Sequence, residues 1–416
     1  VSVKQAVIIQ EPSVEQNIPT RQPDLGPRRS VAFIGSECYP FVKTGGLGDV
    51  MSALPKSLAK LNIDVKVIIP RYKCIPQKFQ EKMEYRGSFD MNLCSDGKQY
   101  YVGIMEYQED GVVYDFIDND EFFSWGNPYT NLIDDIPKFC YFAKAALAAL
   151  NYLNWTPDVV HCHDWQAALV PLYLRTCFQD TDVGRAISVL TIHNLKFQGV
   201  WDTKAVQKIT GLPDYYFTPD KMEFKKDANY LKGGLVYADA ITTVSKTYAE
   251  EIKMPFYGEG LDGLMRARAN SLRGIVNGID YSDYNPETDS HIAKNYSLKN
   301  FRKEKVKNKV ALQEELGLAV DPKAMMIGLV SRLTDQKGLD LVAYMMDELC
   351  QDNIQFVVLG TGEAQYENMF RHFAWKYGDK VSANIYYSEP MSHKIYASSD
   401  AFLMPSRFCL LYTSDA

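Results

Sequence analysis

The sequence has no run of about 18 uncharged apolar residues, the length that a membrane-spanning helix requires. It also has no excess of basic residues, since 45 lysines and arginines stand against 52 aspartates and glutamates for a net charge of -7. A nucleic-acid partner calls for a basic face. These two absences argue against membrane insertion and against nucleic-acid binding. An anionic small ligand would need locally placed lysines and arginines.

A CxxC pair is also missing. The eight cysteines are scattered over the chain at positions 38, 74, 94, 140, 162, 177, 350 and 409. Such spacing is typical of neither a disulfide framework nor a zinc ribbon. The pattern fits a reducing compartment, and no structural metal is expected from it.

The chain is long enough for two or three domains, since 416 residues exceed the usual size of one. From residue 31 onward, short β-branched runs alternate with amphipathic stretches such as 49–61 and 139–153, which predicts parallel strands in doubly wound α/β sheets. The runs expected to be strands are 31–37, 65–70, 112–118, 158–164, 186–193, 240–245, 325–332, 354–360, 383–389 and 400–406.

A stretch rich in Asn, Gly, Asp and Pro at 277–291 divides these runs into two groups. We therefore expect two Rossmann-like domains, at 31–275 and 276–416, that face each other across a cleft. Residues 1–30 are rich in Gln, Pro and Val without helical periodicity, which favours a linker or disordered segment over a targeting peptide. Ligands of such sheets bind beyond the carboxyl ends of the strands, so the residues that follow each strand are the candidates.

The first strand is followed by VKTGGLGDV at 42–50. Because Lys43 precedes the glycines, the loop does not match the Walker A pattern, and the next strand ends in Pro70 and Arg71 where a dinucleotide site needs an acidic residue. Asp49 is expected to cap the helix, whose apolar face is expected at positions 50, 54, 58 and 61. Either the loop approaches a ligand at the helix N-terminus, or it is a tight turn with a solvated lysine.

Three polar strand ends lie close together in the chain. The run at 158–164 places His161 and His163 on one strand face and ends at Asp164, and the next run is followed by His193 and Asn194. A metal site is conceivable, but no further ligand cluster accompanies it, which favours a packed, hydrogen-bonded histidine pair. Three polar ends in adjacent βα units are a stronger signal of function than a lone histidine.

The second group of strands carries cations and an aromatic residue. Arg332 and Lys337 flank a strand-to-helix turn, where they either converge on an anionic group or stand as solvated surface cations. Gly360 forms another glycine turn, and Tyr387 offers a flat face for a base. Cations for a diphosphate, an aromatic for a base and a polar opposite wall describe a nucleotide-sugar site.

Five motifs, in this order, resemble the glycogen/starch synthase family: KTGGLGDV, HCHDWQA, TIHNLKFQG, NGID and SRLTDQKG. The similarity runs from about residue 31 to residue 407. It implies a GT-B fold and an ADP-glucose-dependent glucosyltransferase. Such an enzyme extends the non-reducing end of an α-1,4-glucan acceptor with retained anomeric configuration and without a metal or another cofactor.

The resemblance also implies roles for individual residues. Lys43 matches a donor-binding lysine, and the glycines after it, Gly45 and Gly46, line the donor. Asp164 and His193 match polar residues that hold the transferred glucose, with Asn194 beside them. The remaining matches lie in the second domain: Arg332 and Lys337 would neutralise the leaving diphosphate, Tyr387 would cover the adenine, and Gly360 would lie at the donor.

The match to the family ends after Arg407. The family pattern has Glu-Pro-Cys-Gly-Leu after residue 408, with the glutamate at the reacting centre, whereas this chain has Cys409 followed by LLYTSDA. Residues 409–416 resemble a translated sequencing adaptor, so we expect them to be foreign to an incomplete second domain. The printed chain is therefore expected to be inactive.

Two other classes of function stay open: a non-catalytic glucan-binding or regulatory protein derived from the same fold, and a GT-B enzyme with another donor. An NAD(P)-linked oxidoreductase is disfavoured, because neither glycine turn is followed by an acidic ribose anchor. The reducing compartment is expected to be the cytoplasm, or a plastid if the source is a plant or alga. The sequence predicts no oligomeric state.

Overall fold

The computed structural model describes residues 28–407 except 95–96 and 125. The foreign segment expected at 409–416 lies outside these residues, as do residues 1–27 of the linker expected at 1–30. The predicted end of that linker was wrong, because Arg29 and Ser30 begin the first strand, Arg29–Ile34. The seven cysteines among the described residues are all free, as their scattered spacing predicted. No helix in the described part of the chain is long and apolar enough to cross a membrane.

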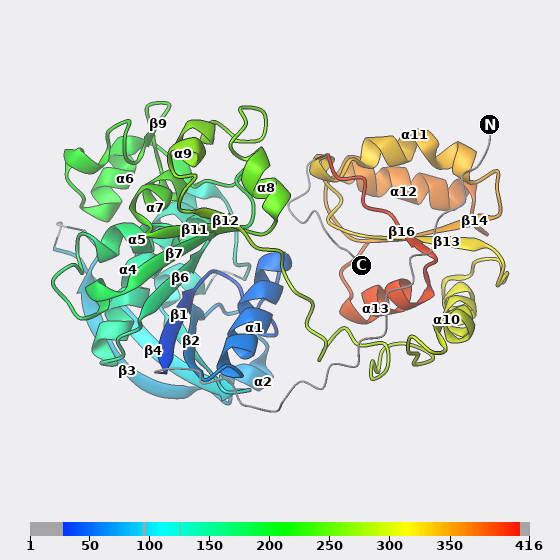
Figure 1. Cartoon of the computed structure of the whole chain (residues 1–416), viewed down its shortest axis with the longest axis horizontal. Coiled ribbons are helices and arrows are strands. Elements are labelled where there is room, and N and C mark those ends of the chain that lie inside the picture. Colours follow the sequence, from blue (N-terminus) through cyan, green and yellow to red (C-terminus); the bar gives the residue numbers. More distant parts are fainter. Residues whose placement is uncertain (1–27, 95–96, 125, 408–416) are drawn as a thin grey trace, which may run out of the picture.

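The chain forms two lobes, the first coloured blue to green and the second yellow to red in Figure 1. The first lobe is built on a nine-stranded sheet of order β12-β11-β7-β6-β1-β2-β5-β4-β3, which is parallel from β12 to β5 and continues antiparallel through β4 and β3. Its strands are β1 (Arg29–Ile34), β2 (Ile63–Pro70), β3 (Glu84–Asn92), β4 (Gln99–Glu109), β5 (Val112–Asp118), β6 (Val159–His163), β7 (Ile187–Ile192), β11 (Ala240–Thr243) and β12 (Leu272–Gly274). A small antiparallel sheet accompanies it, made of β8 (Val200–Trp201), β10 (Asp227–Asn229) and β9 (Glu223–Phe224).

Helices cover the faces of the first sheet (Figure 1). They are α1 (Gly46–Ala59), α2 (Gln77–Gln80), α3 (Asp120–Phe123), α4 (Leu132–Tyr152), α5 (Leu169–Leu174), α6 (Thr203–Thr210), α7 (Tyr230–Tyr237), α8 (Lys246–Glu251) and α9 (Asp262–Ala267). Helix α4 carries the alanine-rich run that predicted it, and Asn131 caps its first turn by accepting a hydrogen bond from the backbone N–H of Asp134.

The second lobe is a four-stranded parallel sheet of order β15-β14-β13-β16. Helices α11 and α12 cover one face of it, and α10 and α13 cover the other (Figure 1). Its elements are α10 (Phe301–Leu316), β13 (Met325–Val330), α11 (Leu339–Leu349), β14 (Ile354–Leu359), α12 (Ala364–Lys376), β15 (Val381–Asn384), α13 (Glu389–Ser398) and β16 (Ala401–Phe402).

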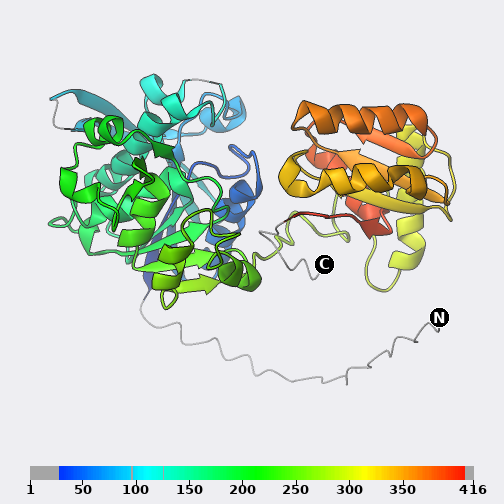
Figure 2. The same ribbon diagram turned by 90° about the horizontal axis from the view of Figure 1, so that it is seen from above.

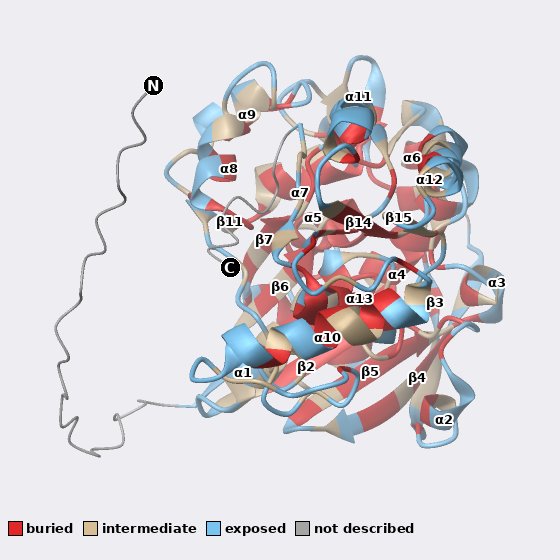
Figure 3. Cartoon of the chain, turned by 90° about the vertical axis from the view of Figure 1, so that its right-hand side faces the viewer, coloured by how far each residue is buried: buried red, intermediate tan, exposed pale blue. Residues whose placement is uncertain are grey.

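Each lobe has its own core. The buried apolar cluster of the first lobe lies within residues 31–272, and the two clusters of the second lobe lie within residues 312–395. Figure 3 shows the buried residues gathered on the central strands and on the inward sides of the helices. The lobes lie side by side in Figure 2, and residues 275–300, which form neither helix nor strand, join them.

All ten predicted strands are present, but some of their boundaries differ from the prediction, and the structure contains strands that the sequence did not predict. The run at 383–389 ends as a strand at Asn384, and its last residue, Glu389, begins helix α13 instead. The sequence did not predict β3 or β4, because β3 is an exposed edge strand with a single buried residue and so lacks an apolar run.

The helix after the glycine loop also differs from the prediction. Gly45 is its N-cap, not Asp49, which lies in the first turn. The fully buried face consists of Leu47, Gly48, Met51, Ser52 and Pro55. Leu54 and Leu58 of the predicted stripe are partly buried and pack against the core, whereas Leu61 lies beyond the helix end and is 54% exposed.

Candidate active site between the two domains

A buried glutamate holds the glycine loop in place. Glu37 follows β1 and is 3% exposed. Its carboxylate accepts hydrogen bonds from the backbone N–H of Thr44 (2.6 Å), the hydroxyl of Thr44 (2.6 Å) and the backbone N–H of Gly45 (3.3 Å). The hydroxyl of Tyr129 donates a fourth hydrogen bond at 2.5 Å. Four donors on one carboxylate fix the loop to the end of the strand.

Lys43 points to the other domain. Its ammonium lies 2.8 Å from a carboxylate oxygen of Asp49 in its own loop and 3.4 Å from one of Glu389 in helix α13. Burial on its own lowers the pKa of Lys43, but the hydrogen bond and charge of Asp49, with the charge of Glu389, outweigh this effect and raise that pKa above its usual value. Lys43 is therefore a charged group at the domain interface and is not a solvated surface lysine.

Gly45 and Gly46 lie at the start of α1 with open space around the position that a Cβ would occupy. The φ of Gly45, -166°, is ordinary extended backbone, so the chain conformation does not itself demand glycine there. The two glycines leave room beside the helix N-terminus, which is the feature that a ligand-binding role requires.

Glu389 joins groups from both domains and from the connecting segment. Besides Lys43, its carboxylate accepts hydrogen bonds from the hydroxyls of Tyr284 and Tyr387, each at 2.7 Å. These bonds and the charge of Lys43 outweigh burial and lower the pKa of Glu389. Tyr387 is itself 67% exposed, so its ring face is accessible.

The three histidines at the strand ends of the first domain form one packed group. The rings of His161 and His163 stack with their centroids 4.4 Å apart, and His163 Nδ1 lies 2.9 Å from His193 Nε2. Nε2 of His161 forms a hydrogen bond with the hydroxyl of Thr191 at 2.6 Å. The packed histidine pair that the sequence favoured is present.

Burial keeps these histidines neutral. It lowers the pKa of His161 to about 3 and that of His193 to about 4, and it lowers the pKa of His163 well below its usual value. Neutral imidazoles both donate and accept hydrogen bonds, so His193 is suited to bind a sugar hydroxyl.

Asp164 stands at the tip of β6 in a strained backbone conformation, with φ 56° and ψ -172°. This region is favourable for glycine and costs other residues about 1–3 kcal/mol. One carboxylate oxygen accepts hydrogen bonds from the backbone N–H groups of His193 (2.7 Å) and Asn194 (3.4 Å). Burial raises the pKa of Asp164 to about 7, with these two hydrogen bonds opposing the rise.

Asn194 reaches the second domain, where its side-chain amide lies 3.5 Å from the side-chain oxygen of Gln336. Gln336 belongs to a short 3-10 turn, Asp335–Lys337, so the loop that carries Lys337 adjoins the strand ends of the first domain. Arg332 precedes this turn and is exposed. Its guanidinium has no hydrogen-bond or ion-pair partner among the residues that the structure describes.

Gly360 is required by its surroundings. Its φ is +154°, and a Cβ there would lie 1.9 Å from the carbonyl oxygen of Ser331. The close approach packs the end of β14 against the loop that begins with Arg332. Any side chain at position 360 would push that loop out of place.

The structure thus brings the predicted residues into two sets. Asp164, His193 and Asn194 are linked to each other, and Lys43 and Tyr387 meet at Glu389. Sequence reasoning missed Glu37 and Glu389. A signal existed for each: Glu37 directly follows the first strand, and Ser388-Glu389-Pro390 carries the N-cap and proline typical of a helix start.

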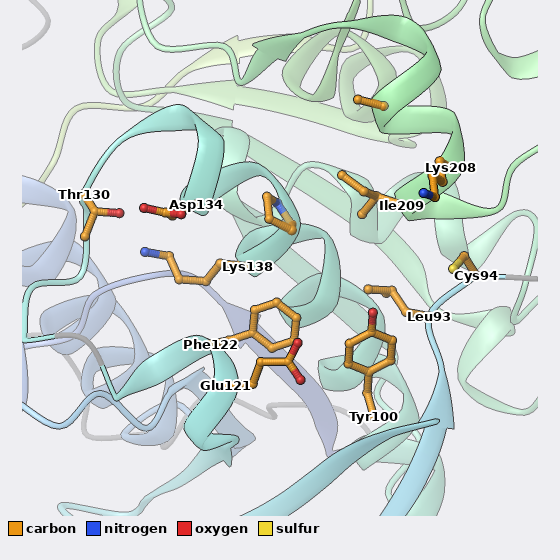
Figure 4. Close-up of a pocket in the computed structure, with 12 residues that line it drawn as sticks. Leu93, Cys94, Tyr100, Glu121, Phe122, Thr130, Asp134, Lys138, Lys208 and Ile209 are labelled. Atoms are coloured by element: carbon orange, nitrogen blue, oxygen red, sulfur yellow. The ribbon is translucent and has the colours of Figure 1, made fainter. Parts of the chain in front are cut away.

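A separate pocket lies away from these residues. A cavity of about 540 Å³ opens between the ends of β3 and β4 and helices α3, α4 and α6 of the first domain, with Tyr100, Phe122, Lys138 and Ile209 in its wall (Figure 4). None of the predicted site residues lines it. We place the candidate site at the facing strand ends because it is there that the polar groups converge.

Comparisons with known proteins agree with this assignment. Residues 30–267 match the family model described as "Starch synthase catalytic domain". The chain is 62% identical to the glycogen synthase of Lachnospira eligens and 58% identical to that of Lachnoclostridium phytofermentans, over 381 residues in each case, which is 91% of this chain and 79% of each relative. The solved catalytic domain of starch synthase IV from Arabidopsis thaliana, bound to ADP and acarbose, superposes with a TM-score of 0.83 at 31% identity, over 92% of this chain and 79% of that one.

Two Rossmann-like domains with polar groups at their facing strand ends define a GT-B glycosyltransferase. Within that class, the chain belongs to the glycogen/starch synthase family. The resemblance seen in its motifs is therefore confirmed, and the names of its relatives support glucan synthase activity.

Proposed function

We propose that this chain derives from an enzyme that transfers glucose from ADP-glucose to the non-reducing end of an α-1,4-glucan, with retention of anomeric configuration. The observation that carries the proposal is the meeting of Lys43 and Tyr387 at one carboxylate, at 3.4 and 2.7 Å. The predicted donor lysine of one domain and the predicted base-covering aromatic of the other thus lie close enough to bind one ligand. The Arabidopsis relative, described as bound to ADP and acarbose, supports the same substrate class.

The proposed mechanism is electrostatic. Breaking the bond between glucose and ADP builds negative charge on the diphosphate, and preorganised positive groups lower the barrier to this step. Arg332, Lys337 and Lys43 supply that charge. Since the Arg332 guanidinium has no partner among the described residues, it can bind phosphate without first breaking an ion pair.

Burial shifts the side chains on the sugar side of the site toward their uncharged forms. Neutral His193 and the carboxyl of Asp164, whose pKa burial raises to about 7, would hold the glucose by hydrogen bonds. Asn194 would bind beside them. We propose that no metal ion contacts the diphosphate in this reaction, because the side chains supply the charge that a divalent cation provides in other transferases.

We further propose that the 416-residue chain does not itself transfer glucose, because Cys409 stands where the family resemblance places a glutamate at the reacting centre. The test uses two proteins. One is the printed chain, and the other joins its residues 1–407 to the corresponding C-terminal remainder of the Lachnospira eligens glycogen synthase.

Calorimetric titration with ADP-glucose is expected to show binding to both proteins and weaker binding of UDP-glucose. Transfer of labelled glucose to an oligosaccharide acceptor is expected only from the joined protein, and a chelator is expected to leave it unchanged. Preference for UDP-glucose would overturn the donor assignment. Transfer by the printed chain would overturn its inactivity, and absence of transfer by a folded joined protein would favour a non-catalytic glucan-binding role.

A further inference from the structure

A cluster of potential metal ligands lies where the connecting segment meets the second domain. Asp283 of that segment and Glu389 and His393 of helix α13 each offer one ligand atom, and these atoms all lie within 4.8 Å of one another. Within residues 28–407, apart from the gaps at 95–96 and 125, no other group of three histidine, cysteine or carboxylate side chains has this spacing. The cluster is separate from the histidines of the first domain.

His393 is held as metal-binding histidines are held. It is 3% exposed, and its Nδ1 lies 2.7 Å from a carboxylate oxygen of Asp289. Its ring stacks on Tyr284, with centroids 4.6 Å apart and planes inclined by 13°. A carboxylate on one ring nitrogen fixes the ring and its tautomer so that the other nitrogen is free to bind a cation.

That other nitrogen, Nε2, is buried and has no hydrogen-bond partner among the described residues. It faces the cluster, 3.9 Å from a carboxylate oxygen of Glu389, which is too long for a hydrogen bond. A buried imidazole nitrogen without a partner is costly, and native structures rarely leave one. A bound cation would remove this cost.

The local charge favours a cation as well. The cluster contains two carboxylates, from Asp283 and Glu389, and Asp289 contacts its histidine. Lys43 contacts Glu389 and shares its charge with a further carboxylate, that of Asp49. Burial raises the pKa of Asp283, and the neighbouring charges of Glu389 and Asp280 add to the rise. A divalent cation would neutralise this excess of negative charge.

We propose that Asp283, Glu389 and His393 bind a divalent transition-metal ion, with Asp289 orienting the histidine. One imidazole nitrogen and two carboxylates suit Zn²⁺, whereas Mg²⁺ and Ca²⁺ prefer oxygen ligands alone. Ligand atoms around Zn²⁺ lie about 3.3 Å apart at bond lengths of about 2.0–2.1 Å. The cluster therefore closes slightly as the ion binds.

The ion would act on the glycine loop through Glu389. Because Glu389 also pairs with Lys43, binding of a cation to its carboxylate weakens that contact and leaves Lys43 with Asp49 alone. The proposed ligands are not among the candidate donor-binding or catalytic side chains, but through Glu389 the site couples the connecting segment to the loop that carries the candidate donor lysine. The proposal goes beyond the proposed function and does not depend on it.

The experiment measures Zn²⁺ binding to the full chain by competition with a chromophoric chelator. All proteins carry Cys74→Ser and Cys177→Ser, since these two exposed thiols would bind zinc on their own. We expect one Zn²⁺ per chain, and much weaker binding of Mg²⁺. The affinity is expected to fall about 10–100-fold in Asp289→Asn, the loss typical of an outer carboxylate, and further in His393→Gln and Glu389→Gln.

His372→Gln serves as the matched control, because this histidine lies in α12 away from the cluster, and it is expected to keep wild-type affinity. Circular dichroism melts establish that each variant is folded. If His393→Gln does not fold, Asp283→Asn and Glu389→Gln decide by the same titration. Failure of the parent chain to bind one Zn²⁺ would overturn the proposal. Unchanged affinity in the cluster variants would overturn it equally.

Discussion

The ammonium of Lys43 and the carboxylate of Glu389 form an ion pair at 3.4 Å that joins the glycine loop of the first domain to helix α13 of the second. Both side chains are largely buried, with 14% and 20% of their surfaces exposed. Lys43 keeps a second and shorter contact with Asp49 at 2.8 Å. A donor that binds Lys43 therefore shares the three N–H groups of the ammonium with these two carboxylates.

Replacing Lys43 by methionine should weaken ADP-glucose binding by about 10–100-fold, since a hydrogen bond to a charged group contributes about 1.5–3 kcal/mol. Calorimetric titration of the folded chain measures the change. Lys56→Met is the control, because Lys56 lies on helix α1, which follows the glycine loop, and pairs with the surface residue Asp110. Equal affinity in Lys43→Met and the parent chain would contradict donor binding by this lysine.

Arg332→Ala should weaken ADP binding without lowering the stability of the fold. The guanidinium has no partner among the described residues, so its loss should change the free energy of unfolding by no more than about 0.5 kcal/mol. Affinity for ADP should fall about 10–100-fold through the lost phosphate contact. Arg371→Ala, which removes a surface pair with Glu367, should alter neither quantity appreciably. Arg332 is a solvated surface cation if ADP binds Arg332→Ala as well as it binds the parent.

Gly360→Ala should destabilise the second domain by about 3 kcal/mol or more, because the new Cβ meets a backbone carbonyl and the φ of +154° is unfavourable for alanine. Gly317→Ala provides the comparison. Gly317 also has a positive φ, +68°, but open space surrounds it, so the cost should be about 1 kcal/mol. Urea denaturation of both variants tests the difference, and similar values would show that the predicted clash at residue 360 is relieved by local movement.

The buried His161 should make stability depend on pH. Its pKa of about 3 lies below the unfolded value of about 6.5, so the unfolded chain takes up a proton that the folded chain refuses, and stability falls as the pH drops below about 6.5. At pH 5 this loss amounts to about 2 kcal/mol. Asp164 has the opposite sign, because its raised pKa lets the folded state bind the extra proton.

Comparison with a variant isolates the histidine. In His161→Gln, the decrease in unfolding free energy from pH 7 to pH 5 should be about 2 kcal/mol smaller than in the parent. Asp164 contributes equally to both proteins, so its contribution cancels when the two are compared. Urea titrations at the two pH values measure it. His372→Gln should keep the parent's dependence, and an identical dependence in His161→Gln would mean that His161 is protonated in the folded state.

The sequence predicted the strands well where both faces are buried. The runs that became β1 and β13 are nearly continuous apolar segments, and the polar residues at the ends of the runs that became β6 and β13 pointed to the site. Edge strands such as β3 lack that signal, because solvent covers much of their surface. Periodicity was less reliable in α1, where the interior proline and two glycines leave few apolar positions to define a face.

Contacts between domains were beyond prediction from the sequence. Glu389 meets Lys43 across 346 positions of the chain, and no local pattern encodes such a pairing. Asp49 shows the same problem at short range. It was predicted to cap the helix, but it is the fourth residue of the helix and forms an ion pair with Lys43 instead. Local patterns report local structure, whereas the domain interface depends on the arrangement of whole lobes.

The separate cores have a consequence for how the protein is made. When residue 274 leaves the ribosome, every strand of the first sheet has emerged. The last strand of the second sheet ends roughly 130 residues later. At a synthesis rate of about 5–20 residues per second, the first sheet therefore emerges roughly 6–26 s earlier. During that interval Lys43 already has Asp49 as a partner, although Glu389 has not yet been synthesised. The first domain can therefore fold on the emerging chain, with its interface lysine already paired, before the second domain is complete.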